Sequence, residues 1–315
     1  MMNSKFPNFG PLITAMVTPF KENLEVDYSA SARLAIKLIE EGNDSLVIAG
    51  TTGESPTLTH DEKIKLFQTV RDAVKAPLIA GTGSYSTQES IRFTQEAESI
   101  GMDGVLIVCP YYSKPPQEGL IRHFKMIAES TKLPIMIYNV PGRTGVNMLP
   151  ETTERLSKIP NIIGIKEASG SVEQVAEIAR RTNRIPLPLG KGSGSASPTI
   201  ERGFTIWSGD DALTLPFLSV GATGVVSVAG HLVAKQIKKM IASFFQGNIA
   251  EAQAIHHELQ NFYKALFMTT NPIQIKAAIR LAGFPVGGLR PPLVDSGEKE
   301  ILALRESMTP LGLLA

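Results

Sequence analysis

Cysteine is almost absent from this sequence, since Cys109 is the only one among 315 residues. A single cysteine cannot build an internal disulfide framework, and its scarcity fits a reducing compartment. Cys109 ends the apolar run Val105–Cys109, where a packed core thiol is favoured over a nucleophile. We therefore look for the chemistry of this protein elsewhere.

An excess of charge of either sign is also lacking. The 31 basic and 30 acidic residues give a net charge of +1, which provides no long-range field for nucleic acid or an anionic membrane. No apolar run reaches the length of a membrane span, and residues 1–7 lack the apolar segment of a signal peptide. These features predict a cytoplasmic protein with no nucleic-acid or membrane partner.

The sequence does contain a regular alternation of short β-branched runs with helical patterns, which is typical of βα units around a parallel sheet. The expected strands are Ile13–Phe20, Ser45–Thr52, Pro77–Ser84, Gly104–Tyr112, Pro134–Pro141, Ile162–Ser169, Phe204–Asp211 and Gly224–Gly230. The expected helices are Asp27–Glu41, Thr59–Lys75, Thr87–Ile100, Gln117–Lys132, Pro150–Lys158, Ser171–Thr182, Asp211–Ser219 and His231–Gln246. Eight units predict an α/β fold, the (β/α)8 TIM barrel. A doubly wound open sheet is the alternative, which is disfavoured because no Gly-x-Gly-x-x-Gly follows the first strand.

A helical C-terminal appendix is expected beyond the eighth strand, so we divide the chain into a barrel core, 1–230, and a final helical region, 231–315. The last three helices of the appendix are expected at Ile249–Met268, Pro272–Ala282 and Ser296–Glu306. They could cover the flank of the barrel or form an oligomer contact, and the sequence does not separate these roles.

Lys166 follows the apolar run Ile162–Ile165, which is typical of a buried parallel strand. An ammonium group in such a strand needs a partner or a lowered pKa. A lysine with a lowered pKa supplies a free amine near neutral pH, and this amine can form a Schiff base with a carbonyl. A structural lysine paired with a carboxylate is the alternative. Alternation along the strand places Glu167 on the opposite face, which argues against Glu167 as that partner.

Polar residues also follow three other expected strands, at the ends that line the active-site face of a TIM barrel. The Gly50–Glu54 segment offers backbone N–H groups and two threonine hydroxyls, which suit a carboxylate. Tyr112 and Tyr138 lie at the ends of the fourth and fifth strands, where a tyrosine hydroxyl linked to Thr51 could shuttle protons. Arg143 could bind a carboxylate through two parallel hydrogen bonds. Taken singly, the tyrosines could equally be rim aromatics, and Arg143 a member of a surface ion pair.

Two carboxylates, Asp210 and Asp211, follow Gly209 at the end of the seventh expected strand. They could bind a metal or cap the next helix, and capping is favoured because Asp is enriched in first turns. A metal site is disfavoured because the five histidines all fall in or next to expected helices. We therefore expect no metal and no cofactor.

Taken together, these segments resemble the dihydrodipicolinate synthase and N-acetylneuraminate lyase family of Schiff-base aldolases. The likeness spans essentially the whole chain, and the combined set of motifs is highly specific. It rests on Gly50–Glu54, Pro110–Tyr112, Tyr138–Gly145, Ile165–Ser169 and Gly209–Asp211.

The resemblance implies that Lys166 forms an imine with pyruvate, whose enamine then attacks an aldehyde. The implied proton relay consists of Tyr138, Thr51 and Tyr112, the last reaching in from a neighbouring subunit. A homotetramer built from two dimers, without a cofactor, is implied as well.

The resemblance also implies how the substrates bind. Thr51 and Thr52 would hold the carboxylate of pyruvate, while Val226 lines the pocket with its backbone and Gly209 lies near the second substrate. Arg143 would hold the carboxylate of L-aspartate 4-semialdehyde, and the sugar-acid lyases of the family usually lack an arginine there. This favours the synthase branch, which makes 4-hydroxy-tetrahydrodipicolinate for lysine and diaminopimelate biosynthesis.

The sequence departs from the family at a possible regulatory pocket for lysine. The resemblance places this pocket at Ser55, His60, Glu89 and Tyr111. Two further positions differ, because Lys63 stands where a histidine is common and Tyr85 where an asparagine is common. These departures argue against feedback inhibition by lysine.

A second departure is the segment Lys191–Arg202, which looks like an insertion in a connection rich in Gly, Ser and Pro. It could alter the access of the second substrate to the site. Two other functions stay open: a related pyruvate-dependent aldolase that acts on a sugar acid or hydroxy-oxo acid, and a non-catalytic sensor of an oxo acid. The sensor is disfavoured because it needs neither an imine lysine nor a proton relay.

Overall fold

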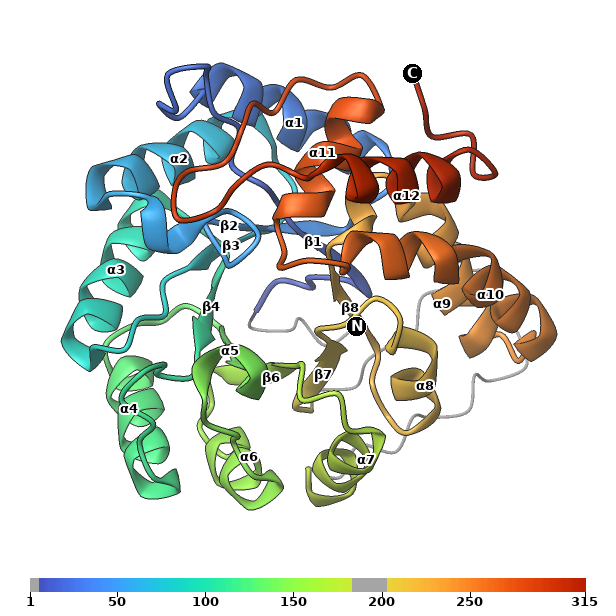
Figure 1. Ribbon diagram of the computed structural model, residues 1–315. Coiled ribbons are helices and arrows are strands. Elements are labelled where there is room, and N and C mark those ends of the chain that lie inside the picture. The colour runs from blue at the N-terminus through green and yellow to red at the C-terminus, as the bar shows by residue number, and fades with distance from the viewer. Residues whose placement is uncertain (1–5, 183–202) are drawn as a thin grey trace.

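The computed structural model describes residues 6–182 and 203–315, and within these ranges eight parallel strands form a closed barrel (Figure 1). Each strand pairs with the next, and β8 pairs with β1 to close the circle. The strands are β1 Leu12–Ala15, β2 Ser45–Ile48, β3 Leu78–Gly81, β4 Gly104–Val108, β5 Ile135–Asn139, β6 Ile162–Glu167, β7 Thr205–Ser208 and β8 Gly224–Ser227. The predicted (β/α)8 TIM barrel is confirmed.

The strands end earlier than the sequence pattern suggested. β2 ends at Ile48, where the expected strand ran to Thr52, and β4 ends at Val108, where it ran to Tyr112. The backbone explains the end of β2, because Ala49 has a φ of 53°, which takes this residue out of the extended conformation. β4 ends two residues before Pro110, which has no N–H to donate to a neighbouring strand. The apolar and hydroxyl residues beyond these points form turns at the mouth of the barrel.

Helices surround the barrel and bury their apolar faces against the outer face of the sheet. Their starts follow from capping side chains: Asp27 accepts a hydrogen bond from the N–H of Ala30, and Thr59 forms a capping box with Glu62. The barrel helices are α1 Tyr28–Glu40, α2 His60–Ala73, α3 Thr87–Ile100, α4 Gln117–Glu129, α6 Pro150–Ser157, α7 Val172–Arg181, α8 Thr214–Ser219 and α9 Ala234–Phe245. Three single turns of helix lie in the connections: η1 Ser55–Thr57, α5 Pro141–Thr144 and η2 Ala229–His231.

Large apolar side chains fill the interior of the barrel. Phe9, Met136, Trp207 and Val226 belong to one buried cluster inside the ring of strands. Gly104 makes room for this filling, since a Cβ at that position would lie 2.7 Å from the ring of Phe9. The barrel therefore has a packed core, and polar chemistry is confined to the ends of the strands.

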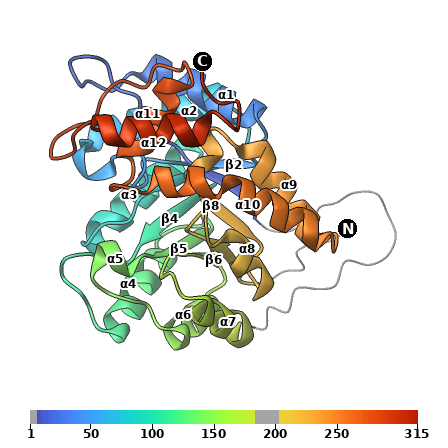
Figure 2. The ribbon, with the colours of Figure 1, turned by 45° about the vertical axis from the view of Figure 1, so that its right-hand side comes forward.

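The C-terminal region forms three further helices, α10 Ile249–Leu266, α11 Ile273–Leu281 and α12 Glu298–Met308. Figure 2 shows α10 alongside α9, and α12 packs on both α10 and α11. The three predicted helices are confirmed, although α12 begins and ends two residues later than expected. Among the described residues, no helix is long and apolar enough to cross a membrane.

Buried and partly buried ion pairs link the C-terminal region to the barrel. The Nζ of Lys276 lies 2.8 Å from Oε1 of Glu54, and Nη2 of Arg290 lies 2.6 Å from Oε1 of Glu62. The division into 1–230 and 231–315 stays a prediction, and these contacts cross it. The predicted insertion, Lys191–Arg202, lies outside the described residues.

Candidate active site

Lys166 lies near the end of β6 and pairs in register with Tyr138 on β5 and Trp207 on β7. Its side chain is buried, with 5% of the residue exposed, and its Nζ lies 4.3 Å from the centroid of the Tyr138 ring. Within residues 6–182 and 203–315, no carboxylate lies within ion-pair distance of this ammonium group. Lys166 is therefore a buried cation whose main contact is the face of an aromatic ring.

Burial lowers the pKa of Lys166 to about 8, because the charged form loses its hydration. The Asp211 carboxylate opposes this shift, and the Arg143 guanidinium adds to it. At pH 7, a pKa of about 8 leaves roughly a tenth of the side chains as free amine, against less than about a thousandth for an ordinary lysine. The site thus provides a nucleophilic amine near neutral pH.

Glu167, the next residue, points away from Lys166 and serves another network. Its carboxylate accepts hydrogen bonds from Asn139, from the backbone N–H of Ser169 and from Gln174. Burial raises the pKa of Glu167, while these hydrogen bonds lower it. The expectation that Glu167 is not the partner of Lys166 is confirmed.

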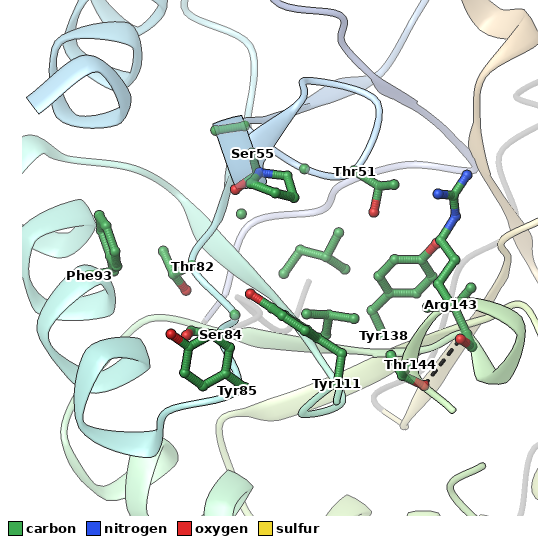
Figure 3. Close-up of a pocket in the computed structure, with 18 of the residues that line it drawn as sticks. Thr51, Ser55, Thr82, Ser84, Tyr85, Phe93, Tyr111, Tyr138, Arg143 and Thr144 are labelled. Carbon is green, nitrogen blue, oxygen red and sulfur yellow. Dashed lines mark hydrogen bonds between the residues drawn. The ribbon is translucent and has the colours of Figure 1, made fainter. Parts of the chain in front are cut away.

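Tyr138 is buried on β5, and its hydroxyl shares a hydrogen bond with the side chain of Thr51. Burial raises the pKa of Tyr138, and both Arg143 and the hydrogen bond with Thr51 oppose that rise. The phenol therefore keeps its proton at neutral pH and can pass it along the bond with Thr51. Figure 3 shows Thr51, Tyr138 and Arg143 gathered on one side of the same cavity.

The turn from Gly50 to Gly53 follows β2 and is flanked by two left-handed residues, Ala49 with a φ of 53° and Glu54 with a φ of 56°. A left-handed backbone costs a residue with a Cβ about 1–2 kcal/mol, so both positions are strained. The hydroxyl of Thr52 is buried and accepts a hydrogen bond of 2.9 Å from Nδ2 of Asn271. Thr51 faces the cavity, whereas Thr52 faces the C-terminal region.

Arg143 lies on α5, the single helical turn that follows β5. Its Nη2 donates a hydrogen bond of 3.1 Å to the backbone carbonyl of Asn271. The side chain lines the cavity beside Thr51 and Tyr138. Of its five N–H donors, several are thus available for an anionic ligand.

Tyr112 stands apart from the other predicted catalytic residues. Its side chain is 92% exposed, its backbone is left-handed, and it is not among the residues that line the cavity. A tyrosine so exposed buries none of its apolar ring within its own chain. The structure of one chain brings together Lys166, Tyr138 and Thr51, and it leaves Tyr112 at the surface.

Gly209 follows directly after β7, the strand that pairs with the strand of Lys166, and Val226 lies on β8, one strand further round the barrel. A Cβ at Gly209 would lie 3.2 Å from Cε of Lys166, so the absence of a side chain leaves space beside the amine. Val226 is buried on β8 and belongs to the apolar cluster inside the barrel. Gly209 therefore leaves space beside the amine, whereas Val226 contributes to the apolar filling of the barrel.

The two carboxylates after Gly209 have separate hydrogen-bond partners. Asp210 accepts from the N–H groups of Ala212 and Leu213, which lie just before α8. Asp211 is buried and accepts from the hydroxyl of Ser227 and from the N–H groups of Val228 and Ala229 beyond β8. Asp210 thus fixes the turn before α8, and Asp211 fixes the residues that follow β8. The expected capping is wrong, because the N-cap of α8 is Leu213, whose apolar side chain makes no capping hydrogen bond. In the described part of the chain, no group of three or more His, Cys, Asp or Glu side chains is placed to hold a metal ion.

A cavity of about 430 Å³ extends from Thr51, Tyr138 and Arg143 toward three of the predicted regulatory residues. Ser55, Glu89 and Tyr111 line its other side, together with Lys63 and Tyr85 (Figure 3). The ring of Tyr85 meets that of Tyr111 edge to face, with 5.4 Å between centroids. Predicted catalytic and regulatory residues therefore share one continuous space.

His60 and Lys166 are not among the residues that line this cavity. The ring of His60 lies 4.7 Å from that of Phe93, which does line it, and its Nε2 lies 3.2 Å from a carboxylate oxygen of Glu96. Lys166 is nevertheless next to a lining residue, because its Nζ lies over the ring of Tyr138, which does line the cavity.

Sequence reasoning missed the residues that the C-terminal region brings to the site, Asn271 and Lys276. Lys276 had a detectable signal, because it interrupts the apolar run Ile273–Ile279 as Lys166 interrupts its strand. Asn271 had no such signal in the sequence, since its role depends on a contact with Thr52, a residue 219 positions away in the chain.

Comparisons with known proteins place this geometry in a family. A family model described as "Dihydrodipicolinate synthetase family" matches residues 8–187 and 194–310. The 4-hydroxy-tetrahydrodipicolinate synthase of Heliobacterium modesticaldum is 53% identical over 307 residues, which cover 97% of this chain and 96% of the relative. That of Desulforamulus reducens is 51% identical and covers 98% of this chain and 99% of its own.

Solved structures show the same likeness. The crystal structure of a dihydrodipicolinate synthase from Cyanidioschyzon merolae, solved with lysine bound, has a TM-score of 0.89 and 47% identity, covering 97% of this chain and 99% of that one. The crystal structure of a dihydrodipicolinate synthase from Bacillus anthracis has a TM-score of 0.88 and 43% identity, and the match covers 96% of this chain and 98% of that one. By sequence, fold and the buried lysine at the mouth of its barrel, the chain belongs to the dihydrodipicolinate synthetase family.

Proposed function

We infer that this protein is a lyase, a 4-hydroxy-tetrahydrodipicolinate synthase, which condenses pyruvate with L-aspartate 4-semialdehyde in lysine and diaminopimelate biosynthesis. The observation that carries this inference is Lys166, a buried lysine with a lowered pKa beside a tyrosine that is hydrogen-bonded to Thr51. The curated relatives that bear this name match nearly the whole chain at about half of its positions, which supports the same activity here.

The proposed reaction begins when the neutral amine of Lys166 attacks the ketone carbon of pyruvate. The resulting carbinolamine loses water and becomes an imine, and loss of a methyl proton gives an enamine. The enamine carbon forms a bond to the aldehyde carbon of the second substrate, whose oxygen takes up a proton. The amino group of that substrate then attacks the imine carbon, closes the ring and releases Lys166 as an amine.

We propose that Tyr138, Thr51 and Tyr112 move the protons in these steps. The hydrogen bond between Tyr138 and Thr51 provides the first link of such a relay. The Tyr138 ring lies against the amine, so its hydroxyl is close to the atoms that gain and lose protons.

The binding roles are proposed from the same geometry. Thr51 and Thr52 would hold the carboxylate of pyruvate at the turn after β2, with Val226 and Gly209 forming the apolar and open sides of the site. Arg143 would hold the carboxylate of the semialdehyde, because its guanidinium faces the cavity and suits a bidentate contact.

Arg143 also supports the synthase over a related pyruvate-dependent aldolase that acts on a sugar acid or hydroxy-oxo acid. A polyhydroxylated substrate needs neutral hydrogen-bond partners, whereas a guanidinium selects a second carboxylate. A non-catalytic oxo-acid sensor would not need a desolvated amine beside a phenol, and we do not favour it.

We propose that the side of the cavity lined by Ser55, Glu89 and Tyr111 is an effector site, with His60 next to it. We call this side the cavity wing. The relative from Cyanidioschyzon merolae was solved with lysine bound. In this chain Lys63 lines the wing and would repel the ammonium group of a lysine effector. Feedback inhibition by lysine is therefore expected to be weak.

We further propose a homotetramer of two dimers, in which Tyr112 enters the site of a neighbouring subunit. Its exposure and its strained backbone support this role, since a strained residue is kept where the surroundings or a partner use it. The sequence also supports a cytoplasmic location, which stays a prediction.

One experiment tests the imine directly. The protein is incubated with pyruvate and borohydride, which reduces an imine to a stable amine, and its peptides are mapped by mass. We expect the adduct on Lys166, and its absence would contradict both aldolase functions. A coupled assay with L-aspartate 4-semialdehyde then separates the synthase from the other aldolase, because only the synthase turns this aldehyde over efficiently.

A further inference from the structure

A buried ion pair connects the C-terminal region to the turn that carries Thr51 and Thr52. Lys276 on α11 and Glu54 at the end of the turn both have fully buried side chains, with 2.8 Å between Nζ and Oε1. Nζ also donates a hydrogen bond to the carbonyl of Gly288, and the second oxygen of Glu54 accepts from the N–H of Arg290. Both oxygens of one carboxylate are thus held by groups from the C-terminal region.

The backbone of Glu54 shows why this anchor matters for the turn. Glu54 is left-handed, as is Ala49 at the other end, although neither is a glycine. Such residues are kept in this conformation only where the surrounding structure determines it. The turn has internal bonds of its own, from Gly53 N–H to the carbonyl of Gly50 and from Glu54 N–H to that of Thr51, but these fix its shape rather than its place.

The place of the turn decides where the threonine hydroxyls lie. Thr51 is three residues before Glu54, shares a hydrogen bond with Tyr138 and lines the cavity. A shift of Glu54 would pass through the rigid turn to Thr51, because the N–H of Glu54 is bonded to the Thr51 carbonyl. A displacement of about 1 Å at a binding group is enough to weaken a site.

We propose that Lys276 is a positioning residue for the pyruvate carboxylate: its ion pair with Glu54 holds the turn that carries Thr51 and Thr52 in the place where this turn can bind the substrate. This inference rests on the proposed function and deepens it. It makes the C-terminal region a part of the catalytic unit, although none of its residues needs to touch pyruvate.

A purely structural role makes a different prediction. The pair could serve only to attach the C-terminal region, as the ion pair of Arg290 with Glu62 also does. In that case its removal would change stability but leave the KM for pyruvate unchanged. A positioning role instead requires a selective change in that KM.

The test replaces both partners, as Glu54→Gln with Lys276→Met, so that no buried charge is left uncompensated. We expect a folded protein whose KM for pyruvate rises about tenfold, which corresponds to about 1.4 kcal/mol of binding. The KM for aspartate semialdehyde should change little, whereas kcat should fall as well, because Thr51 also belongs to the proposed proton relay. Borohydride trapping of the imine should need correspondingly more pyruvate, which reports the effect without turnover.

The matched control is Arg71→Met with Asp103→Asn. This ion pair is also close, at 2.6 Å between Nη1 and Oδ2, but it lies where strands β3 and β4 begin, at the far end of the barrel. Like Lys276, Arg71 also donates to backbone carbonyls, those of Val74 and Ala76. The control should keep the normal KM for pyruvate.

A second variant covers the case in which the double substitution fails to fold. Glu54→Asp keeps the charge and tolerates a left-handed backbone, but its shorter side chain cannot hold Lys276 and the Arg290 N–H without moving the turn. We expect a smaller rise in the KM for pyruvate, about threefold. Normal pyruvate KM in every folded variant of Glu54 and Lys276 would overturn the proposal. If the unsubstituted protein formed no imine at all, the proposed function would fail instead.

Discussion

Two buried lysines in this molecule have opposite surroundings. Lys166 on β6 meets an aromatic ring and has no ion-pair partner in the described ranges, while Lys276 on α11 meets the carboxylate of Glu54 at 2.8 Å. Burial lowers the pKa of both to about 8, although Asp211 opposes the shift at Lys166 and Glu54 opposes it at Lys276. The lysines therefore differ in their contacts and not in their pKa: the Nζ of Lys276 is held by Glu54 and by the carbonyl of Gly288, whereas that of Lys166 meets, among the described residues, only the face of Tyr138. A lowered pKa alone does not make a reactive amine, because the nitrogen must also be free to meet a substrate.

The contrast between Lys166 and Lys276 would fail if Lys166 were not the nucleophile. Lys166→Ala removes the only group proposed to form the imine, so kcat/KM should fall by roughly 10⁴-fold or more. A coupled turnover assay measures this loss, and intact mass after borohydride and pyruvate should show no adduct. An adduct that persists in this variant would move the chemistry to another lysine.

Replacing each lysine by methionine should change the free energy of unfolding in opposite directions. Lys276→Met leaves the buried Glu54 carboxylate unpaired and should cost about 3–5 kcal/mol of unfolding free energy. Lys166→Met should instead stabilise the fold by up to about 3 kcal/mol at pH 7, because the lowered pKa of Lys166 is a cost of folding. This cost is fully present below pH 8 and disappears as the pH rises toward the unfolded pKa.

Urea unfolding at pH 7, followed by circular dichroism, measures both effects. A repeat of the Lys166→Met measurement near pH 10 is the control, since the stabilisation should shrink there. Equal losses of stability in the two variants would mean that Lys166 also depends on a charged partner.

Arg143 sharpens the comparison because it lowers the pKa of Lys166 and is also proposed to bind the second substrate. Arg143→Ala should lower kcat/KM for aspartate semialdehyde about 10- to 100-fold, the cost of a lost charge-assisted hydrogen bond. Imine formation with pyruvate should survive. An equal loss with every aldehyde tested would contradict the carboxylate-binding role.

The smallest effect concerns pH. Since imine formation needs the free amine, kcat/KM for pyruvate should fall roughly tenfold for each pH unit below about 8, the pKa of Lys166. Arg143 lowers this pKa, so Arg143→Ala should move the midpoint to higher pH. A pH profile of trapped imine in both proteins checks the direction, and a downward shift would contradict it.

The fold and much of the site could be predicted because they depend on local patterns. Alternation of apolar runs gave the barrel, and a charge at the end of the run Ile162–Ile165 pointed to Lys166. The end of β2 could not be predicted, because the positive φ of Ala49, a non-glycine residue, leaves no signal in the sequence. Asn271 was missed since its partners, Thr52 and Arg143, are brought to it only by the closed fold.

The proposed role of the exposed Tyr112 ring would make activity depend on the concentration of the protein. If Tyr112 completes the relay of a neighbouring subunit, a lone chain would hold an amine but only part of its proton path, and specific activity would fall on dilution as subunits separate. Two inactive chains would also repair each other: a subunit carrying Lys166→Ala could lend its tyrosine to one carrying Tyr112→Phe. In a mixed dimer one working site would then reappear, a complementation that no single-chain enzyme can show.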